Sequence, residues 1–152
     1  MWQRKQTVFL LLAIAAIILC LLFPVAKFEP AELGGIGSTV YNIGILAGTA
    51  YKFGLSSALA VLLSLAGITS VVAIFTFKSR KSQMRLCSLS MLFLALWYVW
   101  LALSILNAGN SQTNISLAFG ACLPLVAFIL VWLARRGVKA DDDLVRSMDR
   151  IR

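Results

Sequence analysis

The chain of 152 residues has the length of one domain, and 61% of its residues are hydrophobic while only 13% are charged. Its formal net charge of +8 is gathered in short clusters beside apolar runs, which excludes the continuous basic face that nucleic-acid binding requires. The chain contains no histidine, so haem ligation by imidazole and histidine-based acid–base catalysis are excluded as well.

Four apolar segments without charged residues predict four transmembrane helices in a single membrane domain, residues 1–152. They cover residues 7–23, 55–77, 86–106 and 115–133. Helices of these lengths span roughly 25–35 Å, enough to cross the hydrocarbon core of a bilayer. Backbone amides in lipid must bond within their own segment, so we expect an all-α antiparallel bundle.

The first segment resembles a secretory signal, because the basic stretch "MWQRK" precedes an apolar run. Its only small-residue cleavage candidate is Ala26, which has Pro24 two positions before it, at the place where a small residue is required. We therefore expect the segment to be retained as the first helix.

Two connections are expected on the outer side of the membrane. The longer one, 24–54, contains "STVYNIGILAGTAYKFG", which is rich in β-branched, aromatic and glycine residues. This composition favours a short β-hairpin that turns near Gly44 or Gly48 and caps the bundle. The shorter one, "NAGNSQTN" (107–114), predicts that the third and fourth helices are antiparallel neighbours, and Pro124 is expected to kink the fourth helix.

The distribution of basic residues predicts the orientation. All but two of the 14 lysine and arginine residues lie on one side of the predicted helices, and only Lys27 and Lys52 lie on the other. Both termini should therefore be cytoplasmic. The lysine and arginine residues close to the ends of the predicted helices are candidates for contact with anionic lipid headgroups: Lys78, Arg80, Lys81, Arg85, Arg135 and Arg136. Topology determination alone, with no preferred lipid, is the alternative.

The stretch "WYVW" places Trp97, Tyr98 and Trp100 in the outer half of the third helix. They are candidates for an apolar pocket that holds a lipid or a quinone-like ring, whereas ordinary packing is the alternative. At this depth the Tyr98 hydroxyl needs a hydrogen-bond partner, which the sequence does not identify.

The tail, residues 135–152, ends in "KADDDLVRSMDRIR" and predicts an amphipathic helix that starts at Asp141, its N-terminal cap. Its apolar stripe consists of Leu144, Val145, Met148 and Ile151. We expect this stripe to dock on the inner membrane surface, on the cytoplasmic end of the bundle or on a partner. A free tail is the alternative.

No residue pattern in the sequence carries catalytic chemistry. The predicted helices contain no ionisable group for proton coupling, and neither a CxxC pair nor a glycine-rich GK[ST] loop occurs. Cys20 and Cys122 fall in the outward halves of two helices, so a bridge between them is conceivable, although apolar packing is favoured. We therefore expect no metal site, no cofactor and no enzymatic activity.

Three short segments resemble a family of small bacterial membrane proteins catalogued as domain of unknown function 4293, typical of the Bacteroidetes. The segments are "MWQRKQT", "FKSRKSQMRLCSLS" and "LVRSMDRIR". The resemblance implies four membrane helices, a location in the bacterial cytoplasmic membrane and no established activity.

Two functions fit these observations. The first is a non-catalytic accessory or scaffold protein whose partners are membrane lipids and another membrane protein or a second copy of itself, without nucleic acid. The alternative is a protein that binds or handles a lipid or hydrophobic small molecule in a cavity between its helices.

Overall fold

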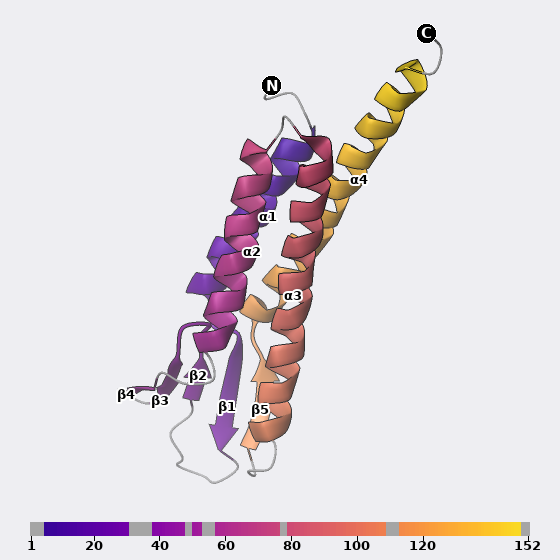
Figure 1. The fold of residues 1–152 in the computed structure, drawn as a ribbon. Coiled ribbons are helices and arrows are strands. Elements are labelled where there is room, and N and C mark those ends of the chain that lie inside the picture. Colours follow the sequence, from indigo (N-terminus) through magenta and orange to yellow (C-terminus); the bar gives the residue numbers. More distant parts are fainter. Residues whose placement is uncertain are drawn as a thin grey trace.

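The computed structural model describes residues 5–30, 38–47, 50–52, 57–76, 79–108 and 113–149. Long helices form a bundle, and a small β-sheet covers one end of it (Figure 1). In chain order the elements are α1 (Lys5–Leu22), β1 (Ala26–Pro30), β2 (Ser38–Val40), β3 (Ile45–Ala47), β4 (Ala50–Lys52), α2 (Ser57–Phe75), α3 (Arg80–Ala108), β5 (Thr113–Leu117), the short 3₁₀ helix η1 (Phe119–Cys122) and α4 (Leu123–Asp149).

The helices pack in a ring of neighbours: α1 on α2 and α4, and α3 on α2 and α4. The chain runs toward the sheet in α1 and α3 and away from it in α2 and α4 (Figure 1). On α2 the buried residues recur every three or four positions, which places them on one face: Leu59, Leu63, Ala66, Ser70 and Ala73. The opposite face is apolar too, since Val61 and Ile68 are exposed. A helix that is apolar on all sides is suited to a lipid environment.

Among the described residues, three helical stretches are long and apolar enough to cross a membrane: Ser57–Phe75, Arg80–Leu106 and Phe119–Asp142. The predicted first span differs, because its apolar helix Gln6–Leu22 is shorter than these three. The 18 residues of α1 amount to roughly 27 Å of helix, slightly less than the thickness of a typical hydrocarbon core.

The two connections that were predicted to lie outside contribute to one antiparallel sheet of five strands among the described residues, in the order β4-β3-β2-β1-β5. Strands β2 and β3 pair with Val40 opposite Ile45, and β3 and β4 pair with Ala47 opposite Ala50. The chain thus reverses near Gly44 and again between Ala47 and Ala50, while Gly48 lies outside the described residues. The sequence did not predict β1 or β5, which pair with each other from Ala26–Leu117 to Pro30–Thr113.

The predicted fourth helix was wrong at its start. Residues Thr113–Leu117 form β5, and α4 begins only at Leu123, after η1. Pro124 consequently lies in the first turn of α4, where its missing N–H has no intrahelical partner to lose, and it does not kink a helix interior.

The tail is helical, but it is not a separate helix. α4 continues without interruption to Asp149 and projects beyond the other helices at the end opposite the sheet (Figure 1). Asp141 therefore lies within a helix and does not cap the start of one. Gly137 alone does not end α4, because no proline or capping residue follows it to stop the helix.

Candidate functional site

Asn42, in the turn between β2 and β3, joins the sheet to the helices. Its fully buried side chain donates from Nδ2 to the main-chain oxygen of Cys20 at 2.6 Å and lies 3.4 Å from Cys20 Sγ. Its Oδ1 accepts the indole N–H of Trp97 at 3.0 Å. One amide therefore satisfies polar groups of both α1 and α3 in an apolar interior, where unpaired groups would be costly.

The segment η1 is fastened to the same region by close backbone contact. The amides of Ala118 and Gly120 donate to the main-chain oxygens of Val25 and Pro24 at 2.9 and 3.2 Å. Cys20 Sγ donates to the main-chain oxygen of Gly120 at 3.2 Å. A Cβ atom at position 120 would overlap the carbonyl oxygen of Pro24, so glycine is required for this approach.

The three aromatic residues predicted to share one pocket lie in different surroundings. Trp97 is fully buried and belongs to the core. The ring of Tyr98 packs edge-on against Trp97, with centroids 5.0 Å apart, and its hydroxyl donates to the main-chain oxygen of Ala121 at 2.7 Å. This oxygen is the partner that the sequence could not identify. Successive residues of a helix point in different directions, and this geometry divides the predicted pocket.

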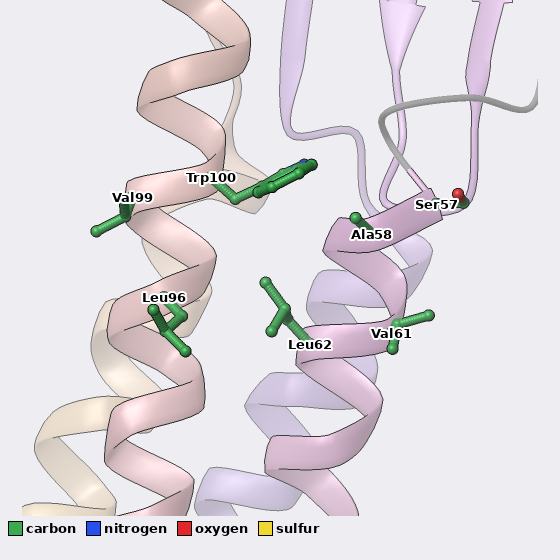
Figure 2. A pocket seen from close by; sticks show the side chains of 7 residues that line it. All are labelled: Ser57, Ala58, Val61, Leu62, Leu96, Val99 and Trp100. Carbon is green, nitrogen blue, oxygen red and sulfur yellow. The ribbon is translucent and has the colours of Figure 1, made fainter.

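Trp100 lines a cavity of about 470 Å³ between α2 and α3. Figure 2 shows its ring extending from α3 toward Ala58 at the start of α2, with Leu62 pointing toward α3 below it. The remaining lining residues are Ser57, Val61, Leu96 and Val99. Every lining side chain except that of Ser57 is hydrophobic, so the cavity suits an apolar chain or ring.

Tyr98 lines a second cavity, of about 640 Å³, between α3 and the segment from β5 to α4. Its walls include Leu101 and Ile105 of α3, together with Phe119 and Leu125. Cys122 is exposed at this cavity, while Cys20 and Cys87 are buried, and all three thiols are free. The conceivable bridge between Cys20 and Cys122 is therefore not formed.

Two serine hydroxyls connect α2 and α3 in the middle of the bundle. Ser70 of α2 and Ser90 of α3 are fully buried, and their Oγ atoms are 2.9 Å apart. Both hydroxyls also lie within hydrogen-bond distance of the main-chain oxygen of Ala66, at 2.8 and 3.1 Å. This compact arrangement satisfies the hydroxyls without an ionisable group and has the character of a helix–helix packing contact.

The structure describes five of the six basic residues predicted to contact headgroups, and they lie in three different surroundings. Lys78 lies outside the described residues, and Arg80 donates from Nη1 to the main-chain oxygen of Asp141 at 3.1 Å. Arg136 lies over the Trp132 ring, with its Cζ atom 5.8 Å from the centroid. The others line one cavity between α3 and α4: Lys81, Arg85 and Arg135.

Among the described residues, the tail contacts the rest of the chain at Asp141. Asp141 Oδ2 accepts a hydrogen bond from Gln6 Nε2 at 2.5 Å, which ties α4 to the beginning of α1. Leu144 and Val145 remain 64% and 40% exposed. The Met148 side chain and Ile151 lie outside what the structure describes. The two described members of the predicted apolar stripe, Leu144 and Val145, are thus not docked on the bundle.

Within the described part of the chain, no group of three or more histidine, cysteine, aspartate or glutamate side chains is arranged to hold a metal ion. The polar contacts described above serve to join backbone segments and helices. Free volume is found in the two apolar cavities and in the basic cavity between α3 and α4.

A family model described as "Domain of unknown function (DUF4293)" matches residues 2–151, nearly the whole chain. The chain therefore belongs to this family. No curated protein matches the sequence.

Proposed function

For this member of the DUF4293 family, we propose a non-catalytic accessory or scaffold function in the cytoplasmic membrane of a bacterium. The protein crosses the membrane four times, with both termini in the cytoplasm. Three helical stretches of sufficient length and apolarity support the crossing, and α1 packs beside α2 and α4 as the fourth.

The two ends of the bundle support this orientation. The sheet covers one end, and the start of α1 and the end of α4 lie at the other (Figure 1). The basic residues of α3 and α4 belong to the end opposite the sheet: Arg80, Lys81, Arg85, Arg135, Arg136, Lys139 and Arg146. Positive charge is retained on the cytoplasmic side of membrane proteins, so the sheet is placed outside.

The observation that carries the accessory function is the projecting part of α4. This helix has 27 residues and a length of roughly 40 Å, and its last turns extend past the other helices. Leu144 and Val145 are exposed there and follow three aspartates, Asp141 to Asp143. A helix that presents apolar side chains away from its own bundle offers a binding surface for another protein or a second copy of this chain.

Photocrosslinking in intact membranes tests this function. A photoreactive residue at Leu144 should give an adduct of one defined protein mass, and Leu144→Ser with Val145→Ser should abolish the association. The same residue at Val138, which is 1% exposed, is the matched control and should give only contacts within the chain. Adducts to lipid alone at position 144, or no adduct at all, would contradict the accessory function.

The orientation has its own test, which uses single cysteines at Ser111 and Ser147 in a background without other cysteines. An impermeant thiol reagent applied to intact cells should label position 111 and spare position 147. The reverse labelling would overturn the proposed sidedness.

A second candidate function is the binding of a lipid or hydrophobic small molecule between the helices. The two apolar cavities, of about 470 and 640 Å³, favour it. Mass spectrometry of molecules that co-purify in mild detergent should then show one enriched compound. Its loss in Trp100→Ala or in Leu101→Trp would assign it to the first or second cavity, and retention in both variants would remove this candidate.

A further inference from the structure

A small cavity opens between α3 and α4 at the end of the bundle opposite the sheet. It has a volume of about 260 Å³ and is lined by Lys81, Met84, Arg85, Ser88 and Arg135. Lys81, Arg85 and Ser88 are four and three residues apart, so they share one face of α3. Arg135 comes from α4, and helix packing brings its charge to the same place as the two cations of α3.

These three cations lie in a part of the sequence that is poor in acidic residues. No aspartate or glutamate occurs anywhere between Glu32 and Asp141, a stretch that includes all of α2 and α3. No ion pair joins the three cations to a carboxylate within the residues that the structure describes. Asp141 lies six residues beyond Arg135, roughly 9 Å further along α4, and its carboxylate accepts from Gln6.

The position of the cations on α3 adds to this imbalance. Lys81 and Arg85 fall in the first two turns of α3, and the first turn contains no acidic residue. The helix dipole places partial positive charge at this end, so lysine and arginine here are unfavourable unless an anion is nearby. A bound anion would interact favourably with both the side chains and the helix end. The hydroxyl hydrogen of Ser88 is not available, since it is donated to the main-chain oxygen of Met84 at 2.9 Å.

The surroundings of the cavity indicate the source of such an anion. The membrane-crossing stretch of α3 begins at Arg80, and one turn beyond the cavity Leu89 and Leu92 are exposed. On α4, Trp132 is 43% exposed and carries the guanidinium of Arg136 over its ring. Exposed tryptophan beside arginine is typical of the membrane–water interface, the level of the lipid headgroups. A headgroup in the cavity thus has apolar helix surface available for its acyl chains.

We propose that Lys81, Arg85 and Arg135 bind the phosphate-bearing headgroup of an anionic phospholipid in the cavity between α3 and α4. The acyl chains lie along the exposed leucines of α3. Basic cavities between membrane helices on the cytoplasmic side bind anionic headgroups elsewhere, which agrees with this chemistry. The inference rests on the proposed membrane function, but it does not require a protein partner.

Native mass spectrometry of the detergent-purified full chain tests the site with phosphatidylglycerol as the added lipid. The triple variant K81Q/R85Q/R135Q should lose at least about tenfold in affinity, since each removed cation contributes to anionic lipid binding. The charge-matched control R136Q/K139Q/R146Q removes the same number of cations outside the cavity and should retain binding. Equal losses in the two variants would show diffuse charge attraction and would overturn the site.

Three further arms identify the ligand and guard against misfolding. Phosphatidylcholine, which carries phosphate without net charge, should bind more weakly than phosphatidylglycerol. Inorganic phosphate should not compete at concentrations comparable to the lipid, and effective competition would overturn a lipid as the source. The variant R85K/R135K keeps the charges and should bind. Loss of binding in this variant at unchanged thermal stability would refute a site that depends on these charges. Because affinity in detergent does not depend on orientation, reversed cysteine labelling would refute the proposed topology while leaving this result intact.

Discussion

At the end of the bundle that carries the sheet, uncharged groups make the contacts between elements, and the most buried of these contacts are those of Asn42. At the opposite end they are made by partly exposed groups that include charges. Asn42 is 0% exposed and serves both Cys20 and Trp97. At the other end, Asp141 is only partly buried and accepts from Gln6 through its carboxylate and from Arg80 through its main-chain oxygen.

The difference has an energetic consequence. A buried polar group that loses its partner costs about 1–3 kcal/mol, whereas exposed charged pairs contribute about 0–1 kcal/mol. The end with the sheet therefore contributes more to stability, because breaking one of its buried hydrogen bonds leaves a polar group unpaired in the interior. At the opposite end, Arg80 and Arg136 have contacts within the chain, whereas Lys81, Arg85 and Arg135 are the cations proposed to bind an external anion.

The largest expected effect is that of Asn42→Ala, which breaks the contact between sheet and helices. It leaves the Cys20 carbonyl and the Trp97 N–H unpaired in the interior, at a cost of about 1–3 kcal/mol for each group. The free energy of unfolding in mixed micelles with increasing dodecyl sulfate measures the loss. Ile43→Ala is the control, since Ile43 is the exposed neighbour and its truncation should cost less than about 0.5 kcal/mol. Equal effects of the two substitutions would show that Asn42 does not hold the sheet in place.

A smaller effect is expected from Gly120→Ala, which tests the close approach of η1 to the chain after α1. The added Cβ would overlap the Pro24 carbonyl, and because backbone cannot yield as a flexible side chain does, we expect a loss of about 1–3 kcal/mol. Gly67→Ala is the matched control. Its Cβ would meet Ile17 Cγ2 at an ordinary 3.6 Å, and alanine favours the helix. Thermal unfolding in detergent should show a lower midpoint temperature for Gly120→Ala and an unchanged one for Gly67→Ala. A lower midpoint temperature in both variants would contradict this contrast.

The approximate positions of the first three helices could be predicted because long uncharged runs have few alternatives in a chain of this composition. The sheet was only partly predictable. The polar–apolar alternation of Asn114, Ile115, Ser116 and Leu117 is a strand signal, but it lies in a run that was assigned to the fourth helix. The pairing of β5 with β1 joins segments far apart in the sequence, and no local pattern indicates it.

The candidate sites show the same limit. The spacing of Lys81 and Arg85 on one helix face is readable from the sequence, whereas the approach of Arg135 depends on how α3 packs against α4. Asn42 carries no local signal, since its partners Cys20 and Trp97 lie in two other elements. The tail was misjudged because three aspartates resemble a helix start, and only the structure shows α4 passing through them.

The smallest effect on global stability is expected at the end opposite the sheet, where Asp141→Asn weakens the acceptor of the Gln6 amide. Because this contact is partly exposed, the free energy of unfolding should fall by about 0.5–1.5 kcal/mol at most. The local dynamics of the end of α4 should change more than the global stability, because Leu144 and Val145 are exposed and do not hold this part of the helix against the bundle. Hydrogen exchange of the α4 amides after Ala140 should accelerate, while that of the Asn42 region should not.

Gly137→Ala provides an independent way to break the same contact, since its Cβ would come within 2.9 Å of Gln6 Cγ. A flexible glutamine can move aside, so the substitution should displace Gln6 from Asp141 at little cost to stability, and alanine should favour α4 itself. If Gln6 is what holds the projecting part of α4, either substitution alone should produce the faster exchange. The double variant should then add nothing, because both changes remove one interaction. Additive effects on the exchange rate would mean that Gly137 and Asp141 act separately. The hydrogen bond from Arg80 to the main-chain oxygen of Asp141 would then be the contact that holds the projecting part of α4.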